Sequence, residues 1–475
     1  MPSTKTPERY REERDSMGTV RVPADAHYGS QTQRAVDNFA HSGLKPPIAF
    51  LRALALIKRS AAQANTQLGL LEPNIADAIV TAADEVIAGR LDDQFVVDLF
   101  QTGSGTSTNM NMNEVIASRS NEILTGKRGG REPVHPNDHV NMGQSSNDVI
   151  PTALHVAAAR HIERTLLPAL AHLKASLADK ATDFKNIRKI GRTHLQDAVP
   201  MTLGQSFSGF ARQIQLATER MGSVMPGLCE LALGGTAVGS GLNAAPGFAS
   251  KTIDGISEET HIRFVEARNH FEAQAGRDAV VAASGALKSV AVSLVKIAND
   301  IRWLGSGPRC GIGELRLPAL QPGSSIMPGK VNPVIPEAVI QMAYQVMGND
   351  TTMTLAGQSG NFELNVTLPL LAHNLLQSLD LIAAASHLLA DKCVRGLQAD
   401  REKCEQYIEQ SLALVTGLVP EIGYDRAAEL AKLAYDTGQT IRQVAEAAGV
   451  LPAEQLDRLL SQDQLDPLKK GDDDE

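Results

Sequence analysis

Aromatic residues and cysteine are both scarce in this sequence. Phenylalanine, tryptophan and tyrosine together make up 4% of the 475 residues, and few stretches alternate polar and apolar residues with many β-branched side chains. A parallel-sheet or β-sandwich core is therefore disfavoured. The four cysteines, Cys229, Cys310, Cys393 and Cys404, lie far apart and form no Cys-x-x-Cys pair, which argues against a zinc ribbon, a ferredoxin-type cluster and a secreted disulfide framework. We expect a reduced, cytoplasmic protein.

The sequence also lacks basic runs and membrane-length apolar runs. Its 45 basic and 54 acidic residues give a formal net charge of −9, and no run of lysine and arginine is interleaved with aromatics, so nucleic acid is not an expected partner. Residues 1–15 mix arginine with glutamate and lack an apolar core, unlike a signal or transit peptide, and no uninterrupted apolar run has the length of a membrane span. We expect a small-molecule ligand and no membrane.

Apolar residues at helical spacing are the main structural signal. The clearest series alternates steps of three and four, which predicts a helix of a bundle. Its members are Val280, Ala283, Leu287, Val290, Leu294, Ile297, Ile301 and Leu304. Similar series run through residues 154–177, 203–214 and 368–382. We therefore expect a mainly α-helical protein with a central bundle of long helices.

Clusters of glycine, proline and polar residues at two places in the chain indicate domain boundaries. They predict an N-terminal domain over residues 1–144, a central helical bundle domain over 145–395 and a C-terminal helical domain over 396–475. A chain of this length can bury a separate core in each of several domains.

The segment from Gly323 to Pro333 packs two hydroxyls, an ammonium and an amide between glycines and prolines. Glycine permits unusual backbone angles and proline fixes φ, so such a run can move and yet return to one geometry over a ligand. It is not a phosphate-binding P-loop, because five residues separate Gly323 from Gly329 and Val331 stands where that motif has Ser or Thr. The apolar stretch that follows predicts a helix whose N-terminal amides point back to the loop. We expect a catalytic loop that binds an anion.

Three further clusters of hydroxyl and amide side chains are expected at helix edges: residues 103–109, 144–148 and 191–197. Taken singly, each is explained better by helix capping, because Ser, Thr, Asn and Asp are favoured at N-caps. Together with the loop, they form a set of donors able to bind a small polycarboxylate. A lone histidine such as His194 is more often a surface residue than a base, but its polar neighbours favour a catalytic interpretation.

Two other patterns carry less weight. Residues 239–244 match the loose dinucleotide pattern G-x-G-x-x-A, but no apolar strand precedes them and Pro246 follows, so a dinucleotide site is discounted. The run from His135 to His139 is weak evidence for a metal site. A loop with an anion-binding edge is the preferred interpretation of that run.

With these motifs assembled, the sequence resembles the class II fumarases of the fumarase and aspartase superfamily. The segment Gly323–Asn332 resembles the superfamily signature GSSxMPxKxN, and the likeness extends over essentially the whole chain. Residues 191–197 have the fumarase form, whereas aspartases typically carry glutamine at the position of His194. Residues 101–106 and 361–365 likewise resemble those of fumarases. The resemblance implies a mainly α, three-domain fumarase/aspartase-like fold and the activity of a fumarate hydratase.

The resemblance also implies a homotetramer in which each active site draws residues from three subunits, without a metal or an organic cofactor. Ser324 would remove the C3 proton of (S)-malate, and His194, polarised by Glu337, would act through a water on the C2 hydroxyl. Removal of that proton places a second negative charge on a carboxylate, and each preorganised donor that stabilises it is worth ~3 kcal/mol. The implied substrate-binding residues are Ser104, Gly105, Thr106, Ser145, Ser146, Asn147, Thr193, Ser325, Lys330, Val331 and Asn332.

A second, non-catalytic anion site of the family would involve His135, Pro136, Asn137 and Asp138. In this sequence Glu132 stands where some relatives have arginine. An acidic side chain where an anion needs a cation argues against an occupied second site.

Two other functions stay open at this point. One is an ammonia-lyase such as aspartase, or another fumarate-releasing lyase of the superfamily, against which His194 argues. The other is a structural protein recruited from the superfamily, as lens crystallins were. The joint presence of Ser324, Lys330, Asn332 and His194 argues against that function, because a structural role needs none of them.

Overall fold

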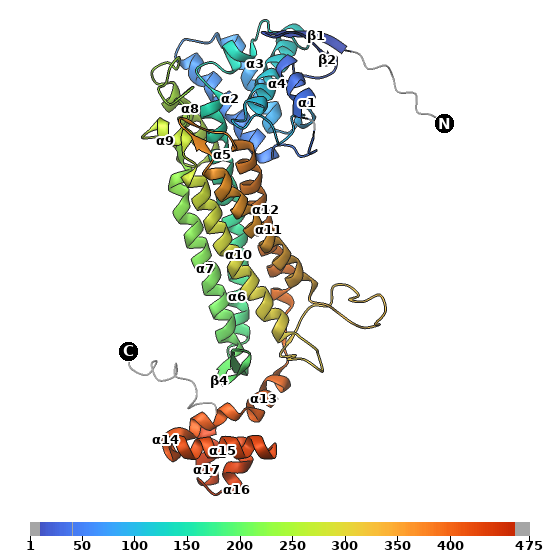
Figure 1. Ribbon diagram of the computed structural model, residues 1–475, viewed down its shortest axis with the longest axis vertical. Helices are drawn as coiled ribbons and strands as arrows, with labels where there is room; N and C mark the ends of the chain where they lie inside the picture. Colours follow the sequence, from blue (N-terminus) through green and yellow to red (C-terminus); the bar gives the residue numbers. More distant parts are fainter. Residues whose placement is uncertain (1–9, 40, 461–475) are drawn as a thin grey trace, which may run out of the picture. The chain divides into compact units, whose positions relative to one another are not determined.

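The computed structural model describes residues 10–460 apart from residue 40. The fold is mainly α-helical, as the sequence predicts (Figure 1). The chain forms two compact units, the first from residues 10–168, 217–291 and 342–383 and the second from residues 169–216, 292–341 and 384–460. Among the described residues, the helices of more than 20 residues are α7 (Leu203–Leu228), α10 (Asp278–Leu304), α11 (Val334–Gly357) and α12 (Leu368–Lys392), and α6 (Leu167–Asp183) is somewhat shorter. The predicted domain boundaries stay a prediction.

The first unit holds most of the N-terminal elements. These are β1 (Tyr10–Asp15), β2 (Gly18–Pro23), α1 (Ser30–Phe39), α2 (Ile48–Gln67), α3 (Pro73–Ile87), η1 (Asp92–Gln94), α4 (Thr106–Thr125), η2 (Pro136–Val140), α5 (Ser146–His161) and η3 (Ile162–Leu166). Later in the chain it contains β5 (Glu230–Leu231), α8 (Phe248–Thr260), β6 (Val265–Glu266), α9 (His270–Ala275), β8 (Gly360–Asn361) and β9 (Leu364–Asn365). β1 pairs antiparallel with β2, β8 pairs antiparallel with β9, and β5 pairs parallel with β6.

The second unit holds the C-terminal helices and two short antiparallel pairs, β3 with β4 and β7 with β10. Its elements are β3 (Arg188–Thr193), β4 (Gln196–Thr202), β7 (Leu315–Arg316), η4 (Val394–Gly396), β10 (Gln398–Ala399), α13 (Arg401–Gln410), η5 (Leu412–Leu418), α14 (Val419–Ile422), α15 (Tyr424–Thr437), α16 (Ile441–Ala447) and α17 (Ala453–Leu460). The last helices share an apolar core that includes Leu418, Leu430, Ile441 and Leu456.

The apolar series predicted from the sequence lie in the core. On α10 the residues from Val280 to Ile301 in the series are fully buried, and Leu304 is 9% exposed. The series from Leu154 to Leu177 is also fully buried, but it passes through a five-residue π-helical turn, η3, between α5 and α6. Helical periodicity therefore locates the buried face correctly and does not reveal the wider turn.

The cluster at residues 191–197 does not lie at a helix edge, and that expectation is wrong. It forms the β3–β4 hairpin, with His194 and Leu195 at its tip at φ values of 57° and 61°. Two successive positive φ angles suit a two-residue hairpin turn, whose twist matches that of the strands. Gly191 lies at the register shift between the strands, where a Cβ would come within 2.7 Å of the Val199 carbonyl oxygen.

Two helices, Asp278–Leu304 and Leu368–Gly396, are long and apolar enough to cross a membrane by length and composition alone. Their most apolar windows are 50% and 67% buried inside the protein. The buried residues include the core series described above, so this apolar character is the one that a core helix needs.

Candidate functional site

The N-terminus of α5 is held by a reciprocal cap. The Ser145 hydroxyl oxygen accepts a hydrogen bond from the Asn147 N–H at 3.2 Å, and Asp148 Oδ1 accepts one from the Ser145 N–H at 2.9 Å. The sequence-based capping interpretation is therefore correct for this cluster. The other carboxylate oxygen of Asp148 accepts hydrogen bonds from the N–H groups of Gly234 and Thr236. Asp148 thus ties the start of α5 to the glycine-rich segment 234–241.

Asp148 is completely buried, and burial raises its pKa to about 6 against the opposing effect of its backbone hydrogen bonds. Asn147, next to it, donates from its side-chain amide to the Ala237 carbonyl oxygen at 2.8 Å. The glycine-rich segment, which overlaps the discounted dinucleotide pattern at residues 239–244, is therefore hydrogen-bonded to the start of α5 through Gly234, Thr236 and Ala237.

Lys58 on α2 lies fully buried below the same group of residues. Its ammonium donates to Asn141 Oδ1 and to Gln144 Oε1, each at 2.9 Å. Burial lowers the pKa of Lys58 to about 7. Asn141 Oδ1 also accepts hydrogen bonds from the side-chain amides of Asn109 and Asn113, which lie one turn apart on α4. One amide oxygen therefore connects α2 and α4 to the segment that leads into α5.

The candidate residues at the start of α4 join this network. The Asn109 amide donates to the Ser146 hydroxyl at 3.0 Å, and the hydroxyl oxygens of Ser104 and Thr106 share a hydrogen bond at 2.9 Å. Gly105, between them, is the N-cap of α4 with a φ of 76°. In the first unit the structure thus brings two of the predicted clusters, residues 104–106 and 145–147, onto one hydrogen-bonded framework.

Sequence reasoning missed Lys58 and Asn141, whereas Asn109 belongs to the predicted cluster at residues 103–109. The signal that could have found Lys58 is its helical spacing from Leu51 and Leu54, two apolar residues of α2 whose side chains are buried. Since lysine is almost never fully buried without partners, such a position indicates polar acceptors around it.

In the second unit the His194 hairpin is anchored by a buried ion pair. Arg192 donates from its two terminal nitrogens to the two carboxylate oxygens of Glu314, at 3.0 Å and 2.8 Å, and Glu314 is fully buried. The Lys189 ammonium lies 3.6 Å from the same carboxylate, and burial lowers the pKa of Lys189. Thr193 and His194 are exposed beyond this anchor.

The loop that contains Ser324 is closed at its base by two hydrogen bonds. The Gly323 N–H donates to the Lys330 carbonyl oxygen at 2.7 Å, and the Asn332 side-chain amide donates to the Gly323 carbonyl oxygen at 2.8 Å. Inside the loop, the Ser324 hydroxyl oxygen accepts hydrogen bonds from the N–H groups of Ile326 and Met327, at 3.2 Å and 3.0 Å.

The side chains of the loop face outward and precede a helix. Ser325, Lys330 and Val331 are exposed, and α11 starts at Val334, as the sequence predicts. Glu337 in the first turn of α11 lies 3.9 Å from the guanidinium of Arg302. Within residues 10–460, residue 40 excepted, no hydrogen bond or ion pair joins Glu337 to His194. The predicted polarisation of His194 by Glu337 is thus not formed within this single chain.

The segment predicted as a second anion site is folded on itself. His135 Nδ1 accepts hydrogen bonds from the N–H groups of Asn137 and Asp138, so this imidazole caps the turn that starts at Pro136. Burial lowers the pKa of His135, which favours the neutral ring. Asp138 Oδ2 lies 3.3 Å from the same nitrogen. A neutral imidazole beside a carboxylate is a poor site for an anion.

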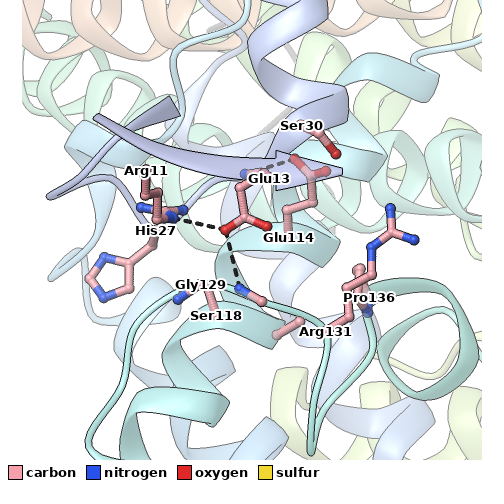
Figure 2. Close-up of a pocket in the computed structure, with 12 residues that line it drawn as sticks. Arg11, Glu13, His27, Ser30, Glu114, Ser118, Gly129, Arg131 and Pro136 are labelled. Atoms are coloured by element: carbon pink, nitrogen blue, oxygen red, sulfur yellow. Dashed lines mark hydrogen bonds and ion pairs between the residues drawn. The ribbon is translucent and has the colours of Figure 1, made fainter. Parts of the chain in front are cut away.

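A small pocket beside this segment is already occupied by carboxylates of the chain (Figure 2). It has a volume of about 20 Å³, enough for one water. Glu13 accepts hydrogen bonds there from the Arg11 guanidinium and the Gly130 N–H. The Glu114 carboxylate accepts hydrogen bonds from backbone N–H groups around the start of α1, including those of Gly29 and Thr32. Arg11, a cationic group of the pocket, therefore already has an acidic partner from within the protein.

Comparison with known proteins places this architecture in a family. A family model described as Lyase matches residues 18–348, and one described as Fumarase C C-terminus matches residues 414–465. The class II fumarate hydratase of Nitrosomonas europaea is 54% identical over 450 residues, which are 95% of this chain and 97% of the relative. The chain belongs to the class II fumarate hydratases. The resemblance inferred from the motifs of this fumarase is thereby confirmed.

Other relatives of this class II fumarase agree. The mitochondrial fumarate hydratase of Danio rerio is 52% identical over 95% of this chain and 89% of its own length. The crystal structure of a class II fumarase from Schistosoma mansoni has a TM-score of 0.93 at 43% identity and covers 96% of this chain and 98% of that one. A structure described as fumarate lyase:delta crystallin from Brucella melitensis bound to cobalt has a TM-score of 0.92 at 48% identity, with 96% and 99% covered.

The buried ion pair below His194 makes a prediction about stability. Glu314→Gln removes the only negative charge of a buried group that contains Arg192 and Lys189, so we expect a loss of roughly 3 kcal/mol in the free energy of unfolding. The matched control is Glu429→Gln, which breaks an exposed ion pair with Arg426 and should cost less than about 1 kcal/mol. Urea unfolding followed by circular dichroism measures both. Equal losses in the two variants would show that Glu314 is not the anchor described here.

Proposed function

We propose that this chain catalyses the reversible hydration of fumarate to (S)-malate by anti addition and elimination of water. The proposal is supported chiefly by the hairpin that presents His194, because residues 191–197 have the fumarase form and the curated relatives are fumarate hydratases. A small dicarboxylate is the substrate, and the reaction proceeds without metal or organic cofactor. The four described cysteines are free, and burial raises the pKa of Cys393 and Cys404 to about 12, which suits a reducing cytoplasm.

In the proposed mechanism Ser324 is the base that removes the C3 proton of malate. A serine hydroxyl is a poor base until its own proton is lost, so its anionic form needs stabilisation. Ser324 Oγ accepts hydrogen bonds from the backbone N–H groups of Ile326 and Met327. Backbone N–H groups are donors of the kind that stabilises an oxyanion. This geometry supports the assignment of Ser324.

The carboxylates of the substrate bind to hydroxyl, amide and ammonium donors. Ser104, Thr106, Ser145, Ser146 and Asn147 supply such donors from the first unit. Thr193, Ser325, Lys330 and Asn332 supply further side-chain donors, and Gly105 and Val331 contribute through their backbone. His194, polarised by Glu337, acts through a water at the C2 hydroxyl.

We further propose a homotetramer whose active sites are shared between subunits. Two observations support it. No hydrogen bond joins His194 to Ser324 within residues 10–460, apart from residue 40. Helices α10 and α11 also expose large apolar residues, Val292, Trp303, Tyr344 and Leu355, each more than half exposed. Contact with neighbouring subunits would remove that apolar surface from water.

The decisive test is an absorbance assay for fumarate with (S)-malate and with aspartate as alternative substrates. We expect fumarate from malate only, and full activity after treatment with EDTA. Release of fumarate from aspartate would instead identify an ammonia-lyase, and no product from either would favour a structural role. Loss of activity to EDTA that one metal restores would contradict the cofactor-free mechanism.

Substitutions of the two proposed acid–base groups test the mechanism. Ser324→Ala and His194→Asn should each lower kcat by about a hundredfold or more, because deletion of a general acid or base has effects of that size. Asparagine tolerates the positive φ of residue 194. His261→Asn is the matched control, since His261 is another exposed histidine, with a φ of 58°. Near-normal turnover of folded His194→Asn, or an equal loss in His261→Asn, would refute the role of His194.

Mixed tetramers test the shared site. When Ser324→Ala and His194→Asn chains are denatured together in equal amounts and refolded, about a quarter of the sites should draw both intact residues from different chains. Roughly a quarter of wild-type activity should therefore return. Each variant refolded alone is the control, and light scattering confirms the tetramer. Activity of the mixture no higher than the mean of its parents would place both residues of a site in one chain.

A further inference from the structure

A group of two histidines and one aspartate lies in the second unit, apart from every residue assigned above to catalysis or substrate binding. His172 comes from α6, and His387 and Asp391 come from α12. The potential ligand atoms, one from each side chain, all lie within 4.8 Å of one another. His387 and Asp391 are four residues apart, so both project from the same face of one helix.

The geometry of this group is close to that of a coordination shell. His172 Nε2 lies 2.7 Å from Asp391 Oδ1, and the two imidazole rings have centroids 5.3 Å apart. Ligand bonds to Zn²⁺ are ~2.0–2.2 Å long for nitrogen and oxygen, so neighbouring ligands in a tetrahedron lie roughly 3.3 Å apart. His387 has to approach the pair, and His172 Nε2 and Asp391 Oδ1 have to separate slightly; His387 and Asp391 are both exposed side chains.

We propose that His172, His387 and Asp391 form a binding site for a divalent transition metal ion that bridges α6 and α12. Two imidazoles and a carboxylate suit Zn²⁺, Co²⁺ or Ni²⁺ and not Mg²⁺ or Ca²⁺, which prefer oxygen ligands. Water completes the coordination. The ion takes the place of the hydrogen bond between His172 and Asp391.

One competitor for the carboxylate is present. Arg395 donates to Asp391 Oδ1 at 3.2 Å, but its side chain is 64% exposed, so it can turn into the solvent when a metal ion binds. An exposed ion pair of this kind is worth little, and metal–ligand bonds to two imidazoles and a carboxylate outcompete it.

The site should stay accessible in a tetramer. The exposed residues of α12 are Asp380, Ala384, His387, Asp391 and Lys392, which form a predominantly polar face. Among the described residues, neither α6 nor α12 has an exposed large apolar side chain, in contrast to α10 and α11. The apolar surfaces that we expect a partner subunit to cover therefore lie on α10 and α11 and not on α6 or α12.

A pair formed by the last residue of α5 and a residue of α12 offers a matched control. His161 Nε2 lies 3.0 Å from Asp380 Oδ1, and each residue stands eleven positions before its counterpart in the pair His172–Asp391. This second His–Asp pair has no second imidazole among the potential metal-binding groups of the described residues. Substitution of His161 therefore measures how much a histidine–aspartate pair without a third ligand contributes to metal binding.

The experiment uses the full chain, stripped with EDTA and desalted, in a Cys310→Ser background that removes the exposed thiol as a competing ligand. Co²⁺ is added while the visible absorption bands of the bound ion are recorded, and Zn²⁺ is then titrated by calorimetry. We expect one ion per chain with a dissociation constant in the micromolar range, no binding of Mg²⁺, and a higher Tm with Zn²⁺ present.

Variants decide the assignment. His172→Ala and His387→Gln should each weaken Zn²⁺ binding by at least about tenfold and abolish the rise in Tm, whereas His161→Ala should leave both unchanged. Circular dichroism checks that each variant is folded. Absence of saturable binding to the parent protein, or equal affinity in the parent and in His387→Gln, would overturn the proposal. Loss of binding in His161→Ala would also overturn it.

Discussion

The buried ammonium of Lys58 is the contact on which the order of the polar site in the first unit depends. An ammonium without water must have acceptors, and here the acceptors are the side-chain oxygens of Asn141 and Gln144. Those two side chains are thereby fixed, and Asn141 in turn fixes two amides of α4. The donors at the helix starts are therefore held in place before any ligand arrives, which is what preorganised binding of charge requires.

The two units use different means to present their candidate residues. In the first unit, hydroxyls and amides sit at the starts of α4 and α5, above a buried network. In the second, His194 and Ser324 sit on a hairpin tip and a loop that are each anchored at the base, by the Arg192–Glu314 pair and by the Gly323–Lys330 bond. In the proposed mechanism, rigid helix starts suit the binding of carboxylates, and anchored loops suit the groups assigned to acid–base chemistry.

Much of the fold and part of the site follow from the sequence. The series on α10 could be predicted because burial repeats every three or four residues, and the Ser145 cap because its hydroxyl and the Asp148 carboxylate have the spacing of a capping box. The His194 hairpin could not be predicted, because the two residues of its turn, His194 and Leu195, adopt positive φ angles. Glycine and asparagine are the residues that usually indicate such a turn. Nor could the role of Lys58 be predicted, because its acceptors lie more than eighty residues away in the chain. For the clusters at residues 103–109, 144–148 and 191–197, spacing alone favoured capping, and only the resemblance to the family assigned single residues to the substrate.

The two hydrogen bonds at the base of the Ser324 loop join its two ends, so the position of these ends does not depend on residues 324–329. They involve only the backbone of Gly323 and Lys330 and one side chain, that of Asn332. Because both bonds flank residues 324–329, that segment can change its conformation while Gly323 and the start of α11 keep their positions. The loop that carries the superfamily signature can therefore move without loosening the helix that follows it.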